Sequence, residues 1–472
     1  MVSELADFGR RIERALTSPG DALSDLFEPG RPIVLARAPG RLDVLGGIAD
    51  YSGSLVLEWP IREACRVAAQ RSSDRRVRIV SPGPGRDAVF DRPLSEFTSG
   101  GRPIDYDAAR TRFCEEPAQA WAAYLAGGLL VLAKERGLAL ESGVRMLVSS
   151  SVPEGQGLAS SAALEVAALA ALSELFEVHL DPRDLALLAQ QVENRVAGAV
   201  CGVMDQMTAV FGEQDRLLAL LCQPAEVQGT VRVPKPIRFF GLDSGIRHAI
   251  SGADYGDVRT GAFMGYRILA EHAGLEVERT GERVRIEDPL WRGYLANVDP
   301  SRFEREWIDL LPERIGGAEF LRRYGGLTDA VSRVDPDRSY AVRQPAAHPI
   351  REHARAQEFR DLLMEPVCAA SLARLGELMA ASHESYGACG LGSEGTDLLV
   401  DLVRRSPHGS GLHGAKITGG GSGGTVAVLA LESSAGEVSG IAREYARLTG
   451  RRPAVVCGSS PGVACMRLGN TP

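Results

Sequence analysis

A glycine-rich stretch in the first half of the chain, residues 152–168 with the sequence VPEGQGLASSAALEVAA, constrains the fold most. It follows an apolar run at residues 144–148 that is typical of a strand, and it leads into an Ala- and Leu-rich helical run that opens at Ser160. Gly155 and Gly157 keep Cβ atoms out of the loop, so a polyphosphate can approach the main-chain N–H groups at the helix start. The stretch predicts an anion site, although a tight turn with a serine N-cap has a similar composition.

A second glycine-rich loop lies near the end of the chain, at residues 414–425 with the sequence GAKITGGGSGGT. Ordering so many glycines is entropically costly, so the loop indicates a close approach of the backbone to a ligand. Neither loop fits the P-loop pattern G-x-x-x-x-G-K-[ST] or the dinucleotide pattern G-x-G-x-x-G. Another kind of loop must therefore hold the predicted ligand.

The length and net charge of the chain limit its domain organisation and the kinds of molecule it is expected to bind. A chain of 472 residues favours two large domains with a cleft between them, and the segment 231–236 with its two prolines is the expected boundary. The net charge is −8 and no basic tract occurs, which argues against a nucleic acid or an anionic membrane as partner. Small molecules are the better expectation, and the sequence does not reveal an oligomeric state.

Cysteine usage and the N-terminus predict a cytoplasmic protein. The eight cysteines are scattered without C-x-x-C or zinc spacing, which is typical of reduced thiols. The N-terminus reads as a short amphipathic helix without the apolar core of a signal peptide, and we expect a helical extension at residues 1–29. No run of about 18 apolar residues predicts a membrane span.

Other segments give weaker signals. Residues 56–61 and 65–70 are predicted to form two separate strands. Residues 72–112 are rich in proline, glycine and charge, which predicts a peripheral segment. The region 279–346 has no readable pattern.

Three stretches in a fixed order carry a resemblance: APGRLDVLGGIADYSG from Ala38, the glycine-rich stretch from Val152, and KITGGGSGGT from Lys416. Together they resemble motifs one, two and three of the GHMP small-molecule kinases. The resemblance implies an α+β, two-domain GHMP kinase fold with the active site in the cleft between the domains. Residues 30–230 would form the N-terminal, ATP-binding domain and residues 231–472 the C-terminal domain.

Within that superfamily the chain resembles the sugar-1-kinase branch. Residues 201–206 (CGVMDQ), 243–259 (DSGIRHAISGADYGDVR) and 381–400 (ASHESYGACGLGSEGTDLLV) are similar to galactokinase segments. Residues 38–65 and several later runs most resemble the kinase domain of the plant-type L-arabinokinase family.

The resemblance assigns two catalytic residues. Asp205 matches the galactokinase aspartate that contacts the anomeric hydroxyl and acts as a base or orienter. Arg41 matches the arginine beside that aspartate and the transferring phosphate, where its permanent charge would keep Asp205 ionised. Structural alternatives are a helix-capping aspartate and a surface arginine after a Pro-Gly turn.

The resemblance also implies ATP and Mg²⁺ as cofactors. Ser161 and Glu193 match the magnesium-binding serine and glutamate of the family, and both are hard oxygen donors. The residues implied to hold the nucleotide phosphates are Gly155, Gly157, Leu158, Ala159, Ser160, Ser161, Ala162, Gly420 and Gly421.

The acceptor side departs from galactokinase in one place. Galactokinase motif one reads GEHTDY where residues 46–51 read GGIADY, so Gly47 and Ile48 replace the acidic residue and histidine that contact the C6 hydroxyl. Asp50 matches the residue that binds the ring O3 and O4 hydroxyls, and Gly202 and Tyr255 also match sugar-contacting positions.

This departure indicates a pentose. L-Arabinopyranose has the ring stereochemistry of galactopyranose without the C6 group, and a buried unpaired hydroxyl costs roughly 1 to 3 kcal/mol. The leading hypothesis is an ATP-dependent sugar 1-kinase that converts L-arabinose to β-L-arabinose 1-phosphate. The alternatives are a galactokinase or another monosaccharide 1-kinase, and a non-catalytic galactokinase-like sugar sensor.

Overall fold

The computed structural model describes residues 2–17, 25–83, 88–247, 253–281, 283–407 and 409–468. The predicted extension at residues 1–29 contains one helix, α1 (Val2–Thr17), whereas Met1 and residues 18–24 lie outside the described residues. Residues 248–252 of the DSGIRHAISGADYGDVR segment also lie outside them.

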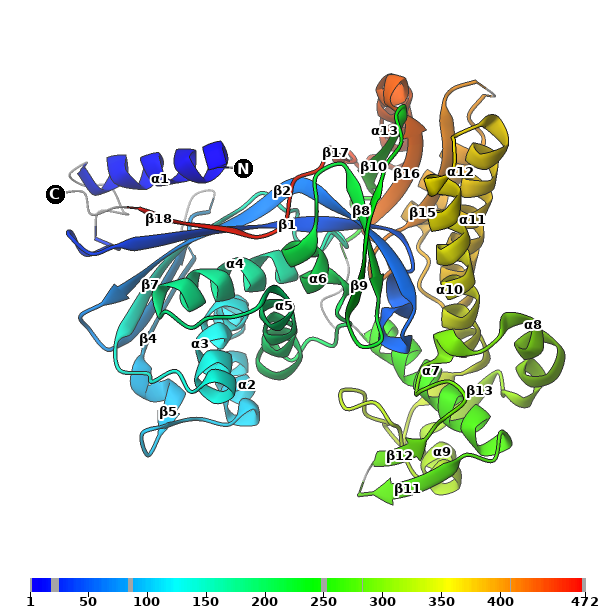
Figure 1. The fold of residues 1–472 in the computed structure, drawn as a ribbon, viewed down its shortest axis with the longest axis horizontal. Helices are drawn as coiled ribbons and strands as arrows, with labels where there is room; N and C mark the ends of the chain where they lie inside the picture. The colour runs from blue at the N-terminus through cyan, green and yellow to red at the C-terminus, as the bar shows by residue number, and fades with distance from the viewer. Residues whose placement is uncertain are drawn as a thin grey trace.

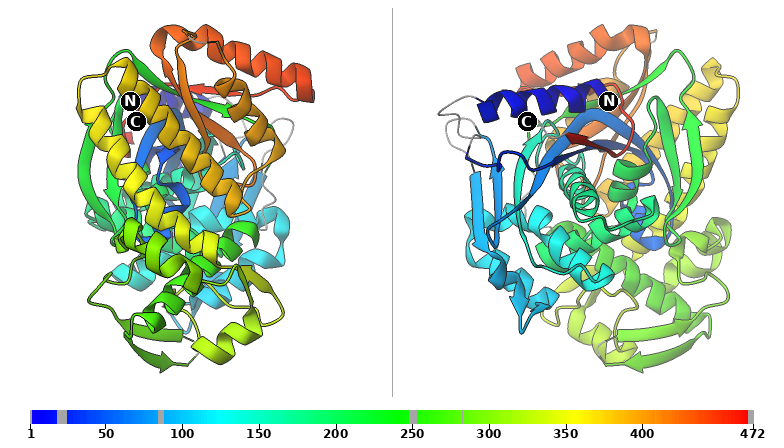
Figure 2. Two further views of the ribbon diagram at one scale, coloured as in Figure 1. Left: turned by 90° about the vertical axis from the view of Figure 1, so that its right-hand side faces the viewer. Right: turned by 60° about the vertical axis from the view of Figure 1, so that its left-hand side comes forward.

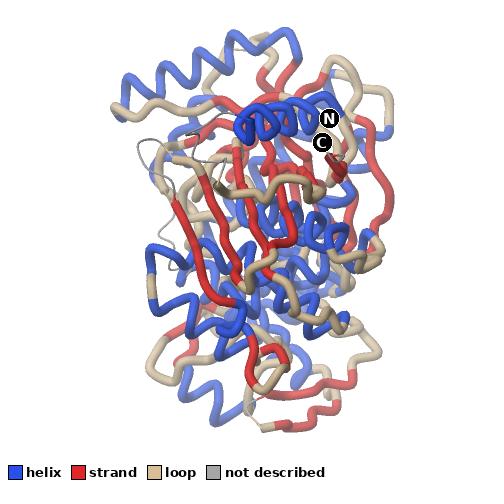
Figure 3. The backbone as a smooth tube through the Cα atoms, turned by 90° about the vertical axis from the view of Figure 1, so that its left-hand side faces the viewer, coloured by secondary structure: helices blue, strands red, loops and turns tan. Residues whose placement is uncertain are grey.

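Two long antiparallel strands, β1 (Ile33–Leu45) and β2 (Leu55–Ser72), form the centre of the fold. Every residue of β1 is buried, including the charged side chains of Arg37, Arg41 and Asp43. The strands that join them are β3 (Arg76–Ser81), β4 (Ala88–Pro93), β7 (Gly143–Ser150), β8 (Arg216–Leu221), β9 (Glu226–Arg232) and β18 (Ala464–Leu468). Among the described residues these form an eight-stranded sheet in the order β18-β1-β2-β7-β3-β4, with β8 also on β2 and β9 on β8 (Figures 1 and 3).

Two strand predictions are wrong. Residues 72–112 are not peripheral, because β3 and β4 extend the main sheet and bury Val77 and Ile79 in its core. The two strands predicted at 56–61 and 65–70 are one strand, β2. Pro60 is tolerated inside it because the pairing with β1 shifts register between Pro39 and Arg41.

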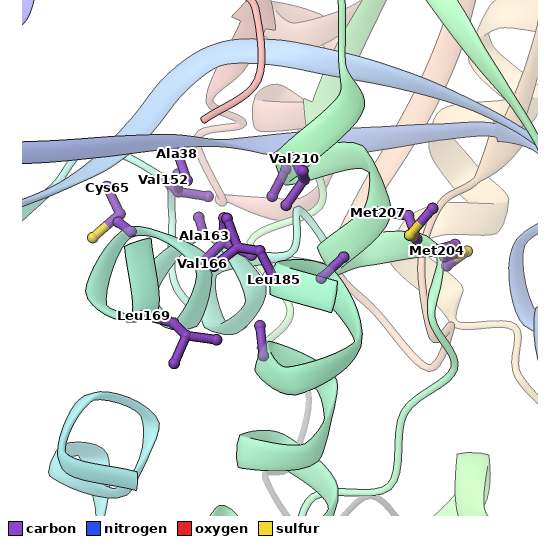
Figure 4. Packing of buried hydrophobic residues seen from close by; sticks show 14 of the residues in the cluster. Ala38, Cys65, Val152, Ala163, Val166, Leu169, Leu185, Met204, Met207 and Val210 are labelled. Carbon is purple, nitrogen blue, oxygen red and sulfur yellow. The ribbon is translucent and has the colours of Figure 1, made fainter. Parts of the chain in front are cut away.

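A layer of helices covers one face of this sheet (Figure 1): α3 (Ala123–Arg136), α4 (Ser160–Leu175), α5 (Pro182–Gln191) and α6 (Met204–Phe211). Figure 4 shows Ala163 and Val166 of α4 close to Ala38 of β1, in the buried cluster that anchors the helix. The other face of the sheet packs against α1 through Leu5, Phe8 and Ile12. Side chains that alternate along the strands therefore give the sheet two apolar faces. The packing of α4 on one of these faces fixes the N-terminal end of the helix, which follows the first glycine-rich loop.

The second half of the chain builds a smaller sheet and a helical layer (Figure 2). Among the described residues the sheet has four strands in the order β15-β16-β10-β17. Its strands are β10 (Ile237–Asp243), β15 (Leu412–Ile417), β16 (Thr425–Leu431) and β17 (Val455–Cys457). The longer helices of this half are α7 (Ala253–His272), α10 (Arg343–Met364), α11 (Ala369–Ala388), α12 (Glu394–Arg404) and α13 (Ala435–Thr449).

The region without a readable pattern, residues 279–346, consists of short elements around a buried cluster that includes Trp291, Phe303 and Phe320. Its elements are β12 (Arg283–Glu287), η5 (Leu295–Asn297), α8 (Pro300–Arg302), η6 (Phe303–Trp307), η7 (Ile308–Leu310), β13 (Arg314–Gly316), α9 (Gly317–Tyr324) and β14 (Ser339–Ala341), with β11 (Glu276–Thr280) just before it. The other elements are η1 (Gly47–Ser52), η2 (Leu94–Phe97), β5 (Thr98–Ser99), β6 (Arg102–Pro103), α2 (Tyr106–Glu115), η3 (Pro117–Ala122), η4 (Val192–Ala197) and η8 (Glu432–Ser434).

The last described strand does not stay with the second half. β18 pairs antiparallel with β1, from Ala464 opposite Arg37 to Leu468 opposite Ile33. The range 231–472 expected for a C-terminal domain therefore includes a strand of the N-terminal sheet, because the edge of β1 needs a partner for its main-chain groups.

Candidate active site

A pocket of about 300 Å³ lies where residues of the two halves meet, a size that suits a small-molecule site. Its walls come from β1, η1, the loop before α4, the π-helical turn η4, the segment leading into α6, α7 and the second glycine-rich loop. The lining residues are Arg41, Ile48, Asp50, Gly155, Gly157, Leu158, Ala159, Ser160, Ser161, Glu193, Val200, Cys201, Gly202, Met204, Asp205, Tyr255 and Gly420.

One end of the pocket is made of main chain. Gly155, Gly157 and Ala159 all have positive φ, at 68°, 72° and 57°, and they turn the backbone into the start of α4. Ala159 is the N-cap residue, and its side chain has no oxygen that could bind the first N–H groups of the helix. These donors and the positive end of the α4 dipole are therefore available to an anion.

The two glycine-rich loops touch each other at this end. A Cβ on Gly419 would come within 2.7 Å of the Gly157 carbonyl oxygen, and a Cβ on Gly424 within 2.7 Å of the Gln156 carbonyl oxygen. Glycine is needed in both places, because any side chain would push the loops apart. The dense glycine pattern of residues 419–424 thus reflects loop-to-loop packing as well as the pocket surface at Gly420.

Arg41 and Asp205 form the polar centre of the pocket. The Nη2 atom of Arg41 lies 2.8 Å from Oδ1 of Asp205, and Nε donates to the same oxygen at 2.9 Å. Arg41 is 3% exposed, so the surface-arginine alternative is excluded, and Asp205 lies in the first turn of α6 after the N-cap Val203. Burial acts to lower the pKa of Arg41, but the carboxylates of Asp205, Glu58 and Asp43 outweigh it and raise that pKa.

A third carboxyl group, Glu58 on β2, lies beside this pair. Its Oε2 is 3.4 Å from Nε of Arg41, the side chain is fully buried, and within the described residues neither carboxyl oxygen has a hydrogen-bond partner. Burial, with Asp43 adding to it, raises the pKa of Glu58 well above its usual range. Arg41 acts in the opposite direction on this pKa, and its guanidinium lies closer to Asp205 than to Glu58.

The other end of the pocket is a wall of side chains from both halves. Asp50 is buried, and its Oδ1 has no hydrogen-bond partner in the described part of the chain. Burial first, and then Asp205, raise the pKa of Asp50 to about 7, although Arg259 acts in the opposite direction. An orphaned carboxylate oxygen that lines a pocket fits a ligand hydroxyl as its missing partner.

Neighbouring residues hold this wall in place. The carbonyl oxygen of Cys201 accepts from Nη1 of Arg259 at 2.9 Å, and Arg259 pairs with Asp329 at 2.8 Å. A Cβ on Gly202 would overlap the Asp50 carboxylate, so this position requires glycine. Tyr255 packs edge-on against Tyr51, with ring centroids 5.9 Å apart.

Ser161 and Glu193 supply hard oxygen donors beside the anion site. Glu193 is buried, and its carboxylate accepts from Nε2 of Gln206 at 2.7 Å and from the Ser161 hydroxyl. Burial first, and then Asp205, raise the pKa of Glu193 to about 7. One hydroxyl and one carboxylate suit Mg²⁺, which keeps most of its ligands as water and phosphate oxygens. Within the described residues no group of three or more His, Cys, Asp or Glu side chains could hold a metal alone.

Three of the residues predicted for the site lie outside the pocket lining. Gly47 faces Tyr386 and Asp43, Ala162 is buried in α4, and a Cβ on Gly421 would meet Leu391 at 2.7 Å. The pocket brings together all the other predicted site residues.

Sequence reasoning missed Glu58, Arg259 as a support of the wall, and Tyr386, whose hydroxyl binds Ile48. Glu58 left a signal, because it is a charged residue inside the apolar run LVLEWPI. Tyr386 left none, because its role depends on a contact between residues 338 positions apart. In the part of the chain that the structure describes, no helix is both long and apolar enough to cross a membrane.

Known proteins are similar to this chain in sequence. Residues 123–213 match the family of GHMP kinases, N terminal domain. The chain is 44% identical to an L-arabinokinase of Arabidopsis thaliana, over 98% of this chain and 49% of that protein, so it spans about half the length of this relative. It is 31% identical to a galactokinase of Chloroflexus aggregans, over 92% of this chain and 94% of that protein.

The fold matches as well. The structure of Lactococcus lactis galactokinase complexed with galactose superposes with a TM-score of 0.72 at 20% identity, over 95% of this chain and 99% of that one. The α+β, GHMP kinase fold expected from the sequence is thereby confirmed. With similarity along almost the whole length of both a galactokinase sequence and a galactokinase fold, the chain belongs to the galactokinase branch of the GHMP kinases.

Proposed function

We propose that the protein is an ATP-dependent sugar 1-kinase that transfers the γ-phosphoryl group of ATP to the anomeric hydroxyl of L-arabinose, giving β-L-arabinose 1-phosphate and ADP. The observation that carries the proposal is the Arg41–Asp205 ion pair, 2.8 Å long, between a main-chain anion site and a wall that contains Asp50 and Ile48. The similarity to the Arabidopsis L-arabinokinase supports the choice of sugar.

The two ends of the pocket have separate tasks in this proposal. The N–H groups at the start of α4, together with Gly155 and Gly157, would bind the ATP phosphates. Asp50 would accept from ring hydroxyls through its unpartnered Oδ1, while Gly202 and Tyr255 complete that wall. Holding both reactants in line supplies a large part of the rate enhancement of a kinase.

Asp205 and Arg41 act at the reacting oxygen. Asp205 orients the anomeric hydroxyl and takes its proton as the oxygen attacks phosphorus. Arg41 faces the same point and stabilises the charge on the moving phosphoryl group. Ser161 and Glu193 would hold Mg²⁺, which when bound neutralises charge on the β- and γ-phosphate oxygens.

The pentose preference follows from Ile48. It lines the pocket, and its side chain offers no hydrogen bond to a hydroxymethyl group on the sugar. A hydroxyl that is buried there without a partner costs roughly 1 to 3 kcal/mol, which corresponds to about one to two powers of ten in preference for L-arabinose over galactose. We assign residues 30–230 together with β18 to the ATP-binding domain. The C-terminal domain then comprises residues 231–463.

A panel of monosaccharides with ATP consumption as the readout tests the proposal. L-Arabinose is expected to give the highest kcat/KM, followed by galactose, with fucose, galacturonate and glucuronate lower. The Asp205→Ala variant serves as the control, since it should still bind ATP but consume none above background. Faster turnover of galactose than of L-arabinose would reject the assigned sugar and leave the kinase assignment standing.

A further inference from the structure

Tyr386 on α11 lies directly behind the acceptor wall and is fully buried. Its hydroxyl accepts from the Ile48 main-chain N–H at 2.9 Å and donates to the Gly419 carbonyl oxygen at 3.1 Å. One side chain of the second half of the chain therefore connects the loop after β1, which bears Ile48, to the second glycine-rich loop.

The same hydroxyl occupies the space of a side chain at position 47. Gly47 has a φ of +44°, and a Cβ built on it would overlap the Tyr386 hydroxyl and lie 2.7 Å from Oδ2 of Asp43. Asp43 cannot move away easily, because its Oδ2 is 2.6 Å from Nζ of Lys416 and both side chains are fully buried. A side chain at position 47 and a hydroxyl at position 386 thus exclude each other.

Buried neighbours fix the position of the Tyr386 ring. His348 packs edge-on against it with centroids 5.2 Å apart, and Nδ1 of His348 is 2.8 Å from the Ser385 hydroxyl. Nζ of Lys416 lies 5.1 Å from the ring centroid on another side. Because close-packed interiors do not deform continuously, the ring cannot yield to a larger residue at position 47.

We infer that Tyr386 is a specificity-determining residue: by filling the space beside Gly47 and binding the main chain of Ile48, it keeps the acceptor wall apolar and favours a sugar without a polar group at that point. This inference rests on the proposed function. It also means that placing a polar pair at positions 47 and 48 alone would not create a galactose site, because the Tyr386 ring stands in the way.

The first test compares L-arabinose with galactose in Tyr386→Phe. Loss of the hydroxyl leaves the Ile48 N–H buried without a partner and loosens the wall, so the loss in kcat/KM should fall mainly on L-arabinose. The ratio of kcat/KM for L-arabinose over galactose is expected to fall at least about fivefold, while the KM for ATP changes less than about threefold. An unchanged ratio overturns the inference.

Tyr266→Phe is the matched control. Its hydroxyl is also buried, donating to Asp288 at 2.8 Å, but on α7 it lies 11 residues, or about 16 Å of helix, beyond Tyr255. The sugar ratio of this variant should stay within about twofold of the starting protein. An equal fall in both variants would show a general packing effect and reject a role in specificity.

The second test measures the mutual exclusion directly. Gly47→Ala is made in the starting protein and in Tyr386→Leu, and kcat/KM is measured with whichever sugar the starting protein uses best. The strain of a positive φ is common to both backgrounds, so the loss caused by Gly47→Ala should be at least about tenfold smaller when the ring is absent. Equal losses overturn the inference even if L-arabinose is the preferred sugar. A galactose preference with unequal losses rejects the proposed sugar and the selection against a polar group, and it keeps only the mutual exclusion of Tyr386 and a side chain at position 47. If Tyr386→Leu does not fold, the ratio of kcat/KM for L-arabinose over galactose in Tyr386→Phe decides the test.

Discussion

The two ends of the pocket are built in different ways. The anion end consists of main chain from residues 155–161, close together in sequence and held on the start of a single buried helix. The acceptor end consists of side chains from β1, η1, α6 and α7, supported from behind by Arg259 and Tyr386. In the proposed function, a phosphate would therefore meet one local motif, whereas a sugar would meet contacts that only the complete tertiary fold assembles.

The difference between the two ends indicates which of them can determine substrate specificity. A loop of glycines and small residues offers N–H groups, which any polyphosphate tail can use. The acceptor wall offers Asp50, whose Oδ1 has no hydrogen-bond partner among the described residues, beside the apolar Ile48, and in the proposed function that contrast would distinguish one sugar from another. Substitutions at the acceptor end should thus change the KM for sugar and leave nucleotide binding intact.

The largest expected effect comes from the residue between the two ends. Asp205→Asn keeps the shape of the side chain but removes the proton acceptor, so kcat should fall by about 10²- to 10⁴-fold while the KM for ATP stays within about threefold. Initial rates over a matrix of sugar and ATP concentrations measure both. A variant that retains more than a tenth of kcat would show that Asp205 is not the proton acceptor.

A smaller effect should follow from Gly202→Ala. The new Cβ would overlap the Asp50 carboxylate, so the wall must shift, and we expect the KM for sugar to rise about 10- to 100-fold with little change in the KM for ATP. Gly256→Ala on α7 is the matched control, because a Cβ there meets no atom within 4 Å. If the KM for sugar and the KM for ATP rise equally in Gly202→Ala, the two ends of the pocket do not act separately.

The smallest expected effect is on stability and depends on pH. Because the pKa of Asp50 is raised to about 7, chiefly by burial, the folded protein holds a proton there between pH 4 and 7 that the unfolded chain has released. Stability from this group is therefore present at low pH and is lost as pH rises through that window, by at most about 1.4 kcal/mol per pH unit.

Asp50→Asn should remove this contribution. The difference in thermal midpoint between variant and starting protein, measured without ligands from pH 5 to 8, is expected to grow in favour of the variant by about 1 °C per pH unit up to pH 7 and then to level off. Glu58 and Glu193 titrate in both proteins and cancel in the comparison. A difference in thermal midpoint that does not depend on pH would show that the pKa of Asp50 is not raised in the folded protein.

Local sequence predicted the anion end well. The strand, loop and helix around residues 144–175 follow from an apolar run, glycines at positive φ and an Ala-rich segment, all within one stretch of chain. Arg41, Asp50 and Asp205 were identified through motif resemblance, and the pocket brings all three together. Gly421 does not line the pocket, and the sequence gives no sign of this, because five glycines in six positions look alike until the neighbour, Leu391, is known.

Long-range contacts explain what the sequence could not predict. The strands at residues 72–112 looked peripheral because their polar faces dominate the composition, while Val77 and Ile79 reach the core. Glu58 is buried beside Arg41 only because β1 and β2 pair, and Tyr386 meets Gly47 only because α11 packs behind η1. Such contacts depend on how distant segments dock, which residue patterns along one segment do not encode.

The pairing of β18 with β1 has a consequence for motion. The chain leaves the first sheet after β9 and re-enters it at β18, so everything between them is attached to that sheet by two separate crossings. A body tethered at two points cannot swing freely and is limited to rotation about the line that joins them. Phe359 of α10 and Leu429 of β16 are buried in the same hydrophobic cluster as residues of β1 and β2, so packing limits even this rotation.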